Sequence, residues 1–484
     1  MPEPISIRPS AAAIPSRLKL WAGRISWAAT APLVLFVGRF GRTFLLSRLL
    51  APAEFGITVA ITIVITTAEL ATDVGLQHFI LLKPAADAPR ALAAAHALQI
   101  VRGLLLSAAI AVLAGPAATF FGVPQAVASF EFVALVPLVR SFGHLGIQQI
   151  QRDYNSRPAA LARTASNAAG LAVAALAAAT ILPDHRVIVL ALLVQTTVAV
   201  AASHILAHAP MRVIPDREAL RQILAYGLPL MLNGVGLAIL AQADRIVVGR
   251  FFGMHILAVY AVAMGLAVAP LSPLFQVIGT LGLSMLARSR DTPKRHLENY
   301  LWLAWFFAFL AFGYAVFIGL TLDVLIPFVF GKAYAVGTDA VILISAIVFV
   351  RILRGASTAA LLASGATTRL TLANLMSVFG IAAAAALARV HPFLTSVLAG
   401  VLFGDILTAV LLLWGSIALL PSGKGSLWRC LAVAAAGIGI LTTRLSLLPD
   451  PTWTNRGIVG ASCALPAAIL GWGVLSQWRL REMT

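Results

Sequence analysis

The chain has 484 residues, of which 60% are hydrophobic and 11% are charged, and its formal net charge at pH 7 is +17. Soluble globular chains average about 45–50% apolar and about 25% charged residues, so this composition excludes an ordinary soluble domain. Apolar runs near 20 residues long predict spanning helices and not the short alternating strands of a barrel. The positive charge is spread over short loops, which argues against a nucleic-acid-binding domain.

In chain order, four basic residues and four prolines in the first 25 residues precede an apolar run long enough to span a bilayer. We expect a cytoplasmic tail over 1–26 and an uncleaved first helix, because a signal peptide has a shorter apolar core. About 14 spans are predicted from apolar length. They cover 27–49, 55–81, 94–114, 128–149, 160–181, 187–208, 224–248, 256–284, 300–328, 338–362, 368–388, 393–419, 427–446 and 457–477.

The loops alternate in charge along the chain. With the N-terminus in the cytoplasm, cytoplasmic segments hold 21 Lys and Arg residues and the opposite side holds 7. Cytoplasmic loops carry the excess of Lys and Arg, so both ends are predicted to be cytoplasmic. Loops 83–93, 150–160, 209–223 and 286–299 are then expected to face the cytoplasm.

Charge lies at membrane depth in the first two spans. Arg39 and Arg42 are spaced i, i+3, and Glu69 and Asp73 are spaced i, i+4, so each pair is expected to share one helix face. A charged residue in a span costs about 2.5–3.5 kcal/mol on insertion scales. These faces should therefore point into protein or into a wet cavity.

The run SRLLAPAEFG, with a tight turn at Ala51-Pro52-Ala53, precedes a long apolar helix that contains ELATDVGL. This opening resembles bacterial polysaccharide flippases of the Wzx type, in the multidrug/oligosaccharidyl-lipid/polysaccharide exporter superfamily. The resemblance implies an all-α polytopic membrane protein with two parallel six-helix lobes and an extra C-terminal helix pair. The expected boundaries are 27–208 and 224–420 for the lobes, 209–223 for a cytoplasmic linker, 427–477 for the extra pair and 478–484 for a cytoplasmic tail.

An internal repeat supports the two-lobe plan. At an offset of 202 residues, SRLLAPAEFGIT at 47–58 aligns with GRFFGMHILAVY at 249–260, and Arg48 falls on Arg250. An even number of spans separates the copies, so they share one orientation, as in transporters with parallel repeats. Pro229, Pro270 and Pro273 are predicted to break the seventh and eighth helices, either to bend them during alternating access or as static kinks.

The predicted spans hold more arginines than acids. Guanidinium groups suit phosphate, because they stay charged and donate paired hydrogen bonds. The alternative is that each arginine is paired internally or reaches an interface. The candidate substrate-binding residues are Arg39, Arg42, Arg102, Arg140, Arg245, Arg351 and Arg354, and the candidate ion-coupling residues are Glu69, Asp73, Asp244 and Asp405.

Depth distinguishes the two arginines of the first span. Measured from Pro52, Arg42 lies about 15 Å deep, Arg39 about 20 Å and Glu69 about 25 Å. Arg39 and Glu69 are therefore expected to pair, which leaves Arg42 for an anionic cargo. Asp244 and Asp405 lie on different helices of the second lobe, and their side chains are expected to approach each other there. Arg351 and Arg354 share a face, with an interfacial position as the alternative.

No enzymatic constellation is visible. His78, His96, His144, His204 and His208 show no metal-ligand spacing with carboxylates, and no glycine-rich loop opens a nucleotide domain. Cys430 and Cys463 lie in apolar helices and are expected to be buried. No cofactor, metal or nucleic-acid partner is expected.

The sequence thus predicts a flippase in the bacterial inner membrane that moves a lipid-diphosphate-linked oligosaccharide to the outer leaflet by alternating access. The expected partners are the oligosaccharide on its polyprenyl diphosphate carrier, membrane lipids and a polysaccharide polymerase. The product would be a cell-surface polysaccharide such as lipopolysaccharide or exopolysaccharide. A cation-coupled multidrug exporter of the same superfamily is the alternative, and a membrane glycan polymerase or ligase is a second alternative.

Overall fold

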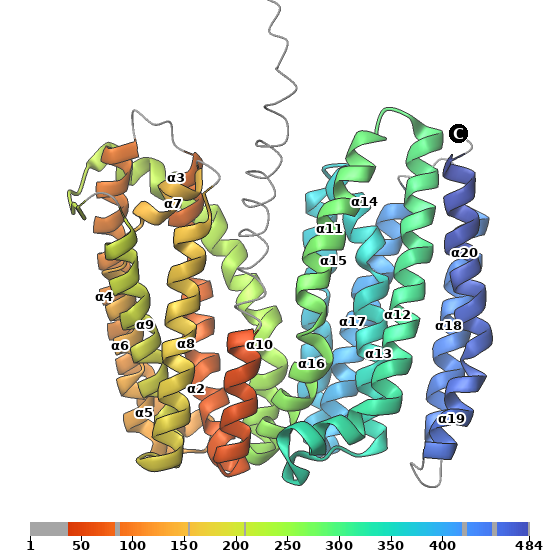
Figure 1. Cartoon of the computed structure of the whole chain (residues 1–484), viewed down its shortest axis with the longest axis horizontal. Coiled ribbons are helices and arrows are strands. Elements are labelled where there is room, and N and C mark those ends of the chain that lie inside the picture. Colours follow the sequence, from red (N-terminus) through yellow and green to blue (C-terminus); the bar gives the residue numbers. More distant parts are fainter. Residues whose placement is uncertain are drawn as a thin grey trace, which may run out of the picture. The chain divides into compact units, whose positions relative to one another are not determined.

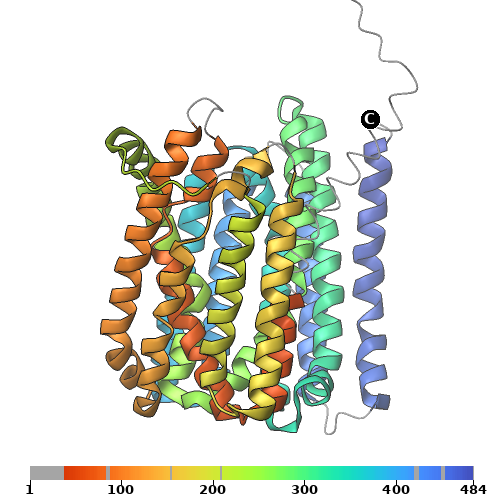
Figure 2. The ribbon, with the colours of Figure 1, turned by 60° about the vertical axis from the view of Figure 1, so that its left-hand side comes forward.

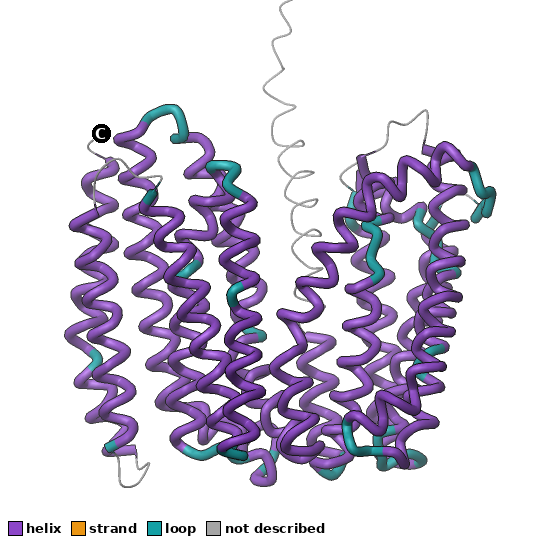
Figure 3. Tube along the Cα trace, turned by 180° about the vertical axis from the view of Figure 1, so that it is seen from behind, coloured by secondary structure: helices purple, strands orange, loops and turns teal. Residues whose placement is uncertain are grey.

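The computed structural model describes residues 37–82, 88–152, 155–207, 210–418, 424–447 and 453–482. Within these ranges the chain consists of helices and short connections, without a β-strand (Figure 3). The predicted cytoplasmic tail over 1–26, the start of the first span and residues 421–423 of the loop before the extra pair lie outside the described residues.

Residues 37–49 are helical. The later helices, in chain order, are α2 (Pro52–Ala71), α3 (Leu76–Leu82), α4 (Ala88–Phe120), η2 (Pro124–Ala126), α5 (Val127–Phe132), α6 (Leu135–Ser141), α7 (Gly146–Arg152), α8 (Arg157–Thr180), α9 (Arg186–Leu206), α10 (Arg217–Val268), α11 (Leu271–Arg288), α12 (Pro293–Phe330), η3 (Lys332–Tyr334), α13 (Thr338–Leu353), α14 (Gly355–Ala363), α15 (Thr367–Leu375), α16 (Ser377–Val390), α17 (Leu394–Ile417), α18 (Lys424–Ser446), α19 (Trp453–Ser462) and α20 (Ala464–Glu482) (Figure 1).

The helices are those of a multi-pass membrane protein. Eleven helical stretches of the described residues are long and apolar enough to cross a bilayer. The predicted count of fourteen is not confirmed. The first predicted span lies partly outside the described residues, and the span predicted over 128–149 is divided among α5, α6 and α7.

The turn predicted at Ala51-Pro52-Ala53 is present. The helix over 37–49 ends there and α2 begins at Pro52, where proline is favoured because its missing N–H needs no partner in the first turn. In α10 the helical dihedrals break at Gly253, with φ 79° and ψ 179°. Gly253 falls 202 residues after Ala51, so both copies of the repeat bend at the same register.

The helix predicted over 55–81 is interrupted. Between α2 and α3 the chain leaves helical geometry, and Gly75 adopts φ 64°. The Asp73 carboxylate accepts a hydrogen bond from the Gly75 backbone N–H at 2.9 Å. Such local bonding of Asp favours turns over helices. The prediction that Asp73 shares a helix face with Glu69 is therefore wrong.

The prolines act differently from one another. Pro229 lies inside α10, which continues past it, so it does not end the helix, and the bend predicted there stays a prediction. Pro270 separates α10 from α11, and Pro273 lies in the first turn of α11, where its missing N–H costs no helical bond.

The chain divides into two compact units. Unit 1 comprises residues 1–45, 68–117 and 125–235, and unit 2 comprises residues 46–67, 118–124 and 236–484. The lobe boundaries expected from the sequence stay a prediction.

In unit 1, α8 and α9 pack along their length as an antiparallel pair (Figures 1 and 2). A buried cluster joins α3 and the start of α4 to α10, and it includes Phe79, Leu92 and Ile223. The predicted linker 209–223 is therefore partly the first turns of α10, which begins at Arg217.

In unit 2, α12 packs against α13, α18 and α20 (Figure 1). The extra C-terminal pair is attached to α12 by a buried ion pair, in which Arg456 of α19 donates to the Asp323 carboxylate at 2.6 and 2.8 Å.

The helices α16 and α17, also in unit 2, approach closely at small residues. A Cβ on Gly380 would stand 2.4 Å from the Gly404 Cα, a contact that only small residues permit between membrane helices.

Candidate functional site

A cavity of about 880 Å³ lies within unit 2. Its lining comes from α10, α11, α12, α13, α14, α15, α16 and α17. Five charged side chains line it: Asp244, Arg245, Arg351, Arg354 and Asp405. All five were predicted as site residues from the sequence, and the cavity brings them together from three parts of the chain.

Two arginines of this cavity neutralise one acid. Arg351 Nε lies 2.8 Å from Asp405 Oδ2, and Arg354 Nη1 lies 3.3 Å from Asp405 Oδ1. The Asp405 side chain is only 6% exposed. The alternative in which both arginines reach toward a membrane interface is therefore wrong, because their guanidinium groups point at a buried carboxylate.

The second acid of the cavity has a neutral partner. Tyr260 donates its hydroxyl hydrogen bond to Asp244 Oδ2 at 2.6 Å, while Asp244 Oδ1 accepts from the backbone N–H of Arg245 at 2.8 Å. Asp244 and Asp405 line the same cavity, so the expected convergence of these two acids is confirmed. Among the described residues, the Arg245 guanidinium has neither a hydrogen-bond partner nor an ion-pair partner.

These charges leave the cavity net positive, with three guanidinium groups against two carboxylates. Phosphate oxygens accept the paired N–H groups of arginine. Arg245 has no partner in the part of the chain that the structure describes, and Arg351 and Arg354 each present further N–H groups beyond their contact with Asp405.

A separate polar chain lies in unit 1. Arg42 Nη1 donates to Gln195 Oε1 at 3.0 Å, and Gln195 Nε2 donates to Asn167 Oδ1 at 2.8 Å. The helix over 37–49 approaches α8 here, since a Cβ on Gly38 would meet the Asn167 side chain at 2.9 Å. The partner of Arg42 among the described residues is thus a neutral amide, which does not compensate the guanidinium charge.

The other arginines of unit 1 hold helices in place. Arg140 forms an ion pair with Glu69. Arg102 donates to the Glu69 carbonyl at 2.8 Å and to the Thr72 hydroxyl at 3.0 Å, at the end of α2, where a cation complements the helix dipole. The predicted pairing of Arg39 with Glu69 is wrong: the Arg39 side chain is exposed, and Arg140 reaches the carboxylate instead.

Sequence reasoning missed the polar neutral residues. Gln195, Asn167 and Tyr260 carry no charge, so the search for buried charge passed over them. It also missed Asp323, because the last predicted span begins at residue 457 and leaves its partner Arg456 just outside the membrane. An amide or hydroxyl inside an apolar helix is the signal that could have found the first three, because such groups need partners in lipid.

Three of the five histidines named in the sequence analysis, His96, His144 and His204, meet in unit 1. The His144 ring lies edge-on to His96, with centroids 4.9 Å apart, and edge-on to His204, with centroids 5.5 Å apart. Carboxylates are not part of this stack, and in the described part of the chain no group of three or more His, Cys, Asp or Glu could hold a metal ion. His208 lies outside the described residues.

A sequence profile described as "Polysaccharide biosynthesis protein" matches residues 45–339. The chain belongs to this family. The matched region starts just before the turn at Ala51 and includes Asp244 and Arg245 of the cavity. No curated protein matches this sequence.

The fold is that of known membrane transporters. A structure described as "Lipid II flippase MurJ, inward closed conformation" has a TM-score of 0.69 at 12% identity, with 92% of this chain and 98% of that chain covered. An inward-facing multidrug resistance MATE family transporter of the MOP superfamily has a TM-score of 0.63 at 15% identity, covering 84% and 99%. A MOP superfamily transporter from Pyrococcus furiosus, whose binding pocket is described as having reverse polarity, has a TM-score of 0.52 at 16% identity, covering 82% and 94%.

Proposed function

We propose that this polysaccharide biosynthesis protein is a flippase for a lipid-diphosphate-linked oligosaccharide. The diphosphate binds in the unit 2 cavity, and the sugar crosses from the cytoplasmic to the outer leaflet of a bacterial inner membrane while the lipid tail stays in the bilayer. The observation that carries the proposal is the guanidinium of Arg245, which has no ion-pair partner among the described residues and lies beside the Arg351–Arg354–Asp405 cluster. A charge held at membrane depth without a counter-ion marks a substrate pathway.

The cargo is anionic in this proposal because of the charge balance of the cavity. A cationic drug would meet three arginines, of which Arg351 and Arg354 share the single negative charge of Asp405. This balance disfavours the multidrug exporter alternative. Family membership and the fold shared with a protein named as a lipid II flippase support the choice of a lipid-linked glycan.

Within unit 1, Arg42 is a separate candidate contact for an anion in this proposal, apart from the unit 2 cavity. Its partner in the described part of the chain is the Gln195 amide, which does not compensate the guanidinium charge. We assign no cargo contact to Arg102, which binds the end of α2, or to Arg140, which pairs with Glu69. We also assign none to Arg39, whose side chain is exposed.

For coupling, Asp244 is the best candidate among the four acids. Asp405 accepts from two arginines and Glu69 pairs with Arg140, so neither attracts a cation. Asp73 accepts from a backbone N–H in a turn. Asp244 lines the cavity, and its partners among the described residues are a tyrosine hydroxyl and a backbone N–H. A membrane potential supplies about 2.3 kcal/mol per charge per 100 mV, and a proton or cation at Asp244 would use it.

The test is reconstitution with a fluorescent lipid-diphosphate-linked oligosaccharide in proteoliposomes. We expect wild type to expose the sugar to the opposite leaflet and Arg245→Gln to slow this about tenfold or more, since a hydrogen bond to a charged group contributes about 1.5–3 kcal/mol. Arg429→Gln, which removes the same charge at the exposed start of α18, should transport as wild type.

Equal rates for wild type and Arg245→Gln would remove this arginine from the mechanism. The same vesicles distinguish the enzyme alternative, because a polymerase or ligase would lengthen or transfer the glycan. In cells, depletion of a flippase should accumulate the lipid-linked oligosaccharide on the cytoplasmic leaflet.

A further inference from the structure

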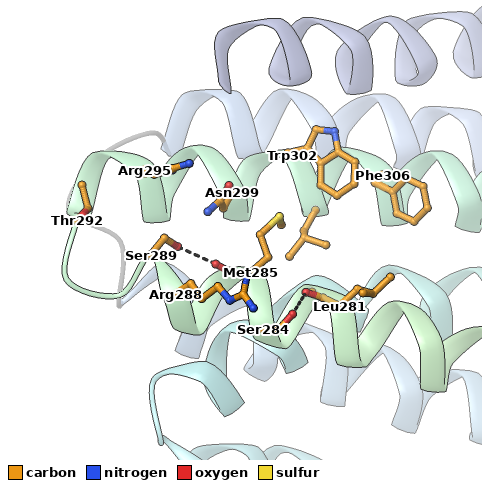
Figure 4. Close-up of a pocket in the computed structure, with 12 residues that line it drawn as sticks. Leu281, Ser284, Met285, Arg288, Ser289, Thr292, Arg295, Asn299, Trp302 and Phe306 are labelled. Atoms are coloured by element: carbon orange, nitrogen blue, oxygen red, sulfur yellow. Dashed lines mark hydrogen bonds between the residues drawn. The ribbon is translucent and has the colours of Figure 1, made fainter. Parts of the chain in front are cut away.

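A second pocket, of about 580 Å³, lies where α11 turns into α12 (Figure 4). It shares no lining residue with the charged cavity of the proposed function. The turn belongs to loop 286–299, which the charge count predicts to face the cytoplasm. The pocket therefore stands at the predicted level of the cytoplasmic leaflet surface.

The outer part of this pocket is cationic. Arg288 at the end of α11 and Arg295 at the start of α12 line it from facing helices (Figure 4). Neither guanidinium has a hydrogen-bond or ion-pair partner among the described residues. The nearby acids, Asp291 in the turn and Glu298 on α12, do not line the pocket.

A buried amide follows the two arginines. Asn299 is 3% exposed, lines the pocket and makes no side-chain hydrogen bond to a described residue. Burying an amide without a partner costs free energy, so this group is suited to bind a polar part of a ligand. The hydroxyl groups of Ser284 and Ser289 donate to backbone carbonyls of their own helix, which leaves their oxygens as acceptors.

The inner part of the pocket is apolar. Trp302 and Phe306 stack with ring centroids 5.4 Å apart on α12, and Leu281 and Met285 face them from α11 (Figure 4). From Asn299 to Phe306 the helix advances about 10 Å. A ligand that fits must carry an anionic head and an apolar tail of at least that length.

We propose that this pocket binds one anionic glycerophospholipid of the cytoplasmic leaflet. Its phosphate lies between Arg288 and Arg295, its head-group hydroxyls reach Asn299, and one acyl chain runs along Trp302 and Phe306. Basic pockets between spanning helices on the cytoplasmic side bind anionic head groups in this way. The assignment does not depend on the proposed cargo.

The experiment uses the full chain in nanodiscs of phosphatidylcholine with a minor fraction of phosphatidylglycerol, followed by native mass spectrometry of retained lipids. Wild type should retain one phosphatidylglycerol more than the double variant Arg288→Gln, Arg295→Gln. The matched control Arg290→Gln, Lys294→Gln removes the same charge from the same turn, outside the pocket, and should retain lipid as wild type. Asn299→Leu, which changes no charge, should also lose the lipid.

Equal retention by wild type and the pocket variant, or equal loss in the control pair, would overturn the site. Addition of a polyprenyl diphosphate at equal mole fraction separates the two sources of a lipid phosphate. Displacement of the retained phosphatidylglycerol would assign the pocket to the transported lipid and overturn the assignment to a resident phospholipid. Retention of phosphatidylglycerol supports it. Thermal unfolding of each variant near the wild-type temperature shows that the comparison is made on folded protein.

Discussion

At the scale of single residues, the intramembrane arginines differ in what neutralises them. Arg102 and Arg140 bind the end of α2 and Glu69, so their charge is used within the protein. Arg42 has an amide partner and Arg245 has none in the described part of the chain. The seven arginines predicted within the spans therefore have different roles, and the side chains that each one contacts determine its role.

The two acids of the cavity should respond differently to removal of their charge. Asp405→Asn removes the buried carboxylate that Arg351 and Arg354 both contact, and breaking such a pair costs about 3–5 kcal/mol. We expect lower membrane abundance and a lower unfolding temperature for Asp405→Asn. Asp244→Asn keeps an acceptor for Tyr260 and should unfold near wild type while losing its response to an imposed gradient. Membrane abundance and gradient-driven transport should be measured for both variants. An Asp405→Asn variant as stable as wild type would contradict the structural role of Asp405.

Asp216 makes the attachment of the segment before α10 dependent on pH. Its pKa is held below the ordinary value near 3.8 by the backbone N–H of Ala219 and then by the guanidinium of Arg90. Because the folded pKa is lowered, this stabilisation is present above the unfolded pKa and is lost as the pH falls through the folded pKa. At neutral pH the Asp216 carboxylate forms an ion pair with Arg90 at 2.6 Å, which attaches residues 210–216 to the start of α4.

A nitroxide attached through Val213→Cys, which is 49% exposed, would report this attachment. We expect its mobility to be low at pH 7 and to rise only as the pH falls below about 3.8. In an Asp216→Asn background the mobility should be high already at pH 7. A label that is as mobile at pH 7 in the parent as in the Asp216→Asn background would contradict the assignment.

At the scale of the elements, the repeated turns serve as a crossing point within unit 2. A Cβ on Gly56 would stand 1.9 Å from the Met254 carbonyl oxygen, so the start of α2 touches the start of the helix that follows Gly253. Arg48 donates to the Val329 carbonyl at 2.7 Å, at the end of α12. Its repeat equivalent Arg250 lies over the Phe120 ring at 5.6 Å, at the end of α4.

The crossing predicts an unusual effect of alanine. Gly→Ala in a helix ordinarily stabilises by about 0.5–1 kcal/mol. Gly56→Ala should instead destabilise by about 1–3 kcal/mol, because the new methyl group meets a backbone oxygen that cannot rotate away. Gly439→Ala in α18, where a Cβ meets nothing within 4 Å, is the matched control. Unfolding temperatures in detergent measure both, and a Gly56→Ala as stable as the control would exclude the close crossing.

At the scale of the whole molecule, the distribution of positive charge predicts the orientation in the membrane. Thr292 lies in the turn before α12, and Ala335 follows η3 beyond the other end of α12; both are exposed. The native Cys430 and Cys463 are buried at 1% and 2% exposure, so introduced cysteines can be labelled against a low background.

We expect an impermeant maleimide added to intact cells to label Ala335→Cys but not Thr292→Cys. Opening the cells should make Thr292→Cys reactive. The physical reason is the excess of Lys and Arg in the loops on the Thr292 side, which are retained in the cytoplasm. Labelling of Thr292→Cys from outside would reverse the orientation and with it the predicted side of the lipid pocket.

The sequence by itself determined the all-α membrane class, the turn at Ala51 and the repeat, because apolar run length, proline and charge act locally along the chain. It also named the five charged residues of the unit 2 cavity, because charge in an apolar helix is conspicuous. Only the tertiary structure decided their partners. Arg140 and not Arg39 reaches Glu69, and Asp405 lies between two arginines, because ion pairing depends on which helices pack together. The turn at Asp73 likewise depends on a local hydrogen bond to Gly75. The contacts of Gln195 with Arg42 and of Tyr260 with Asp244 depend on helix packing. Helical periodicity encodes neither.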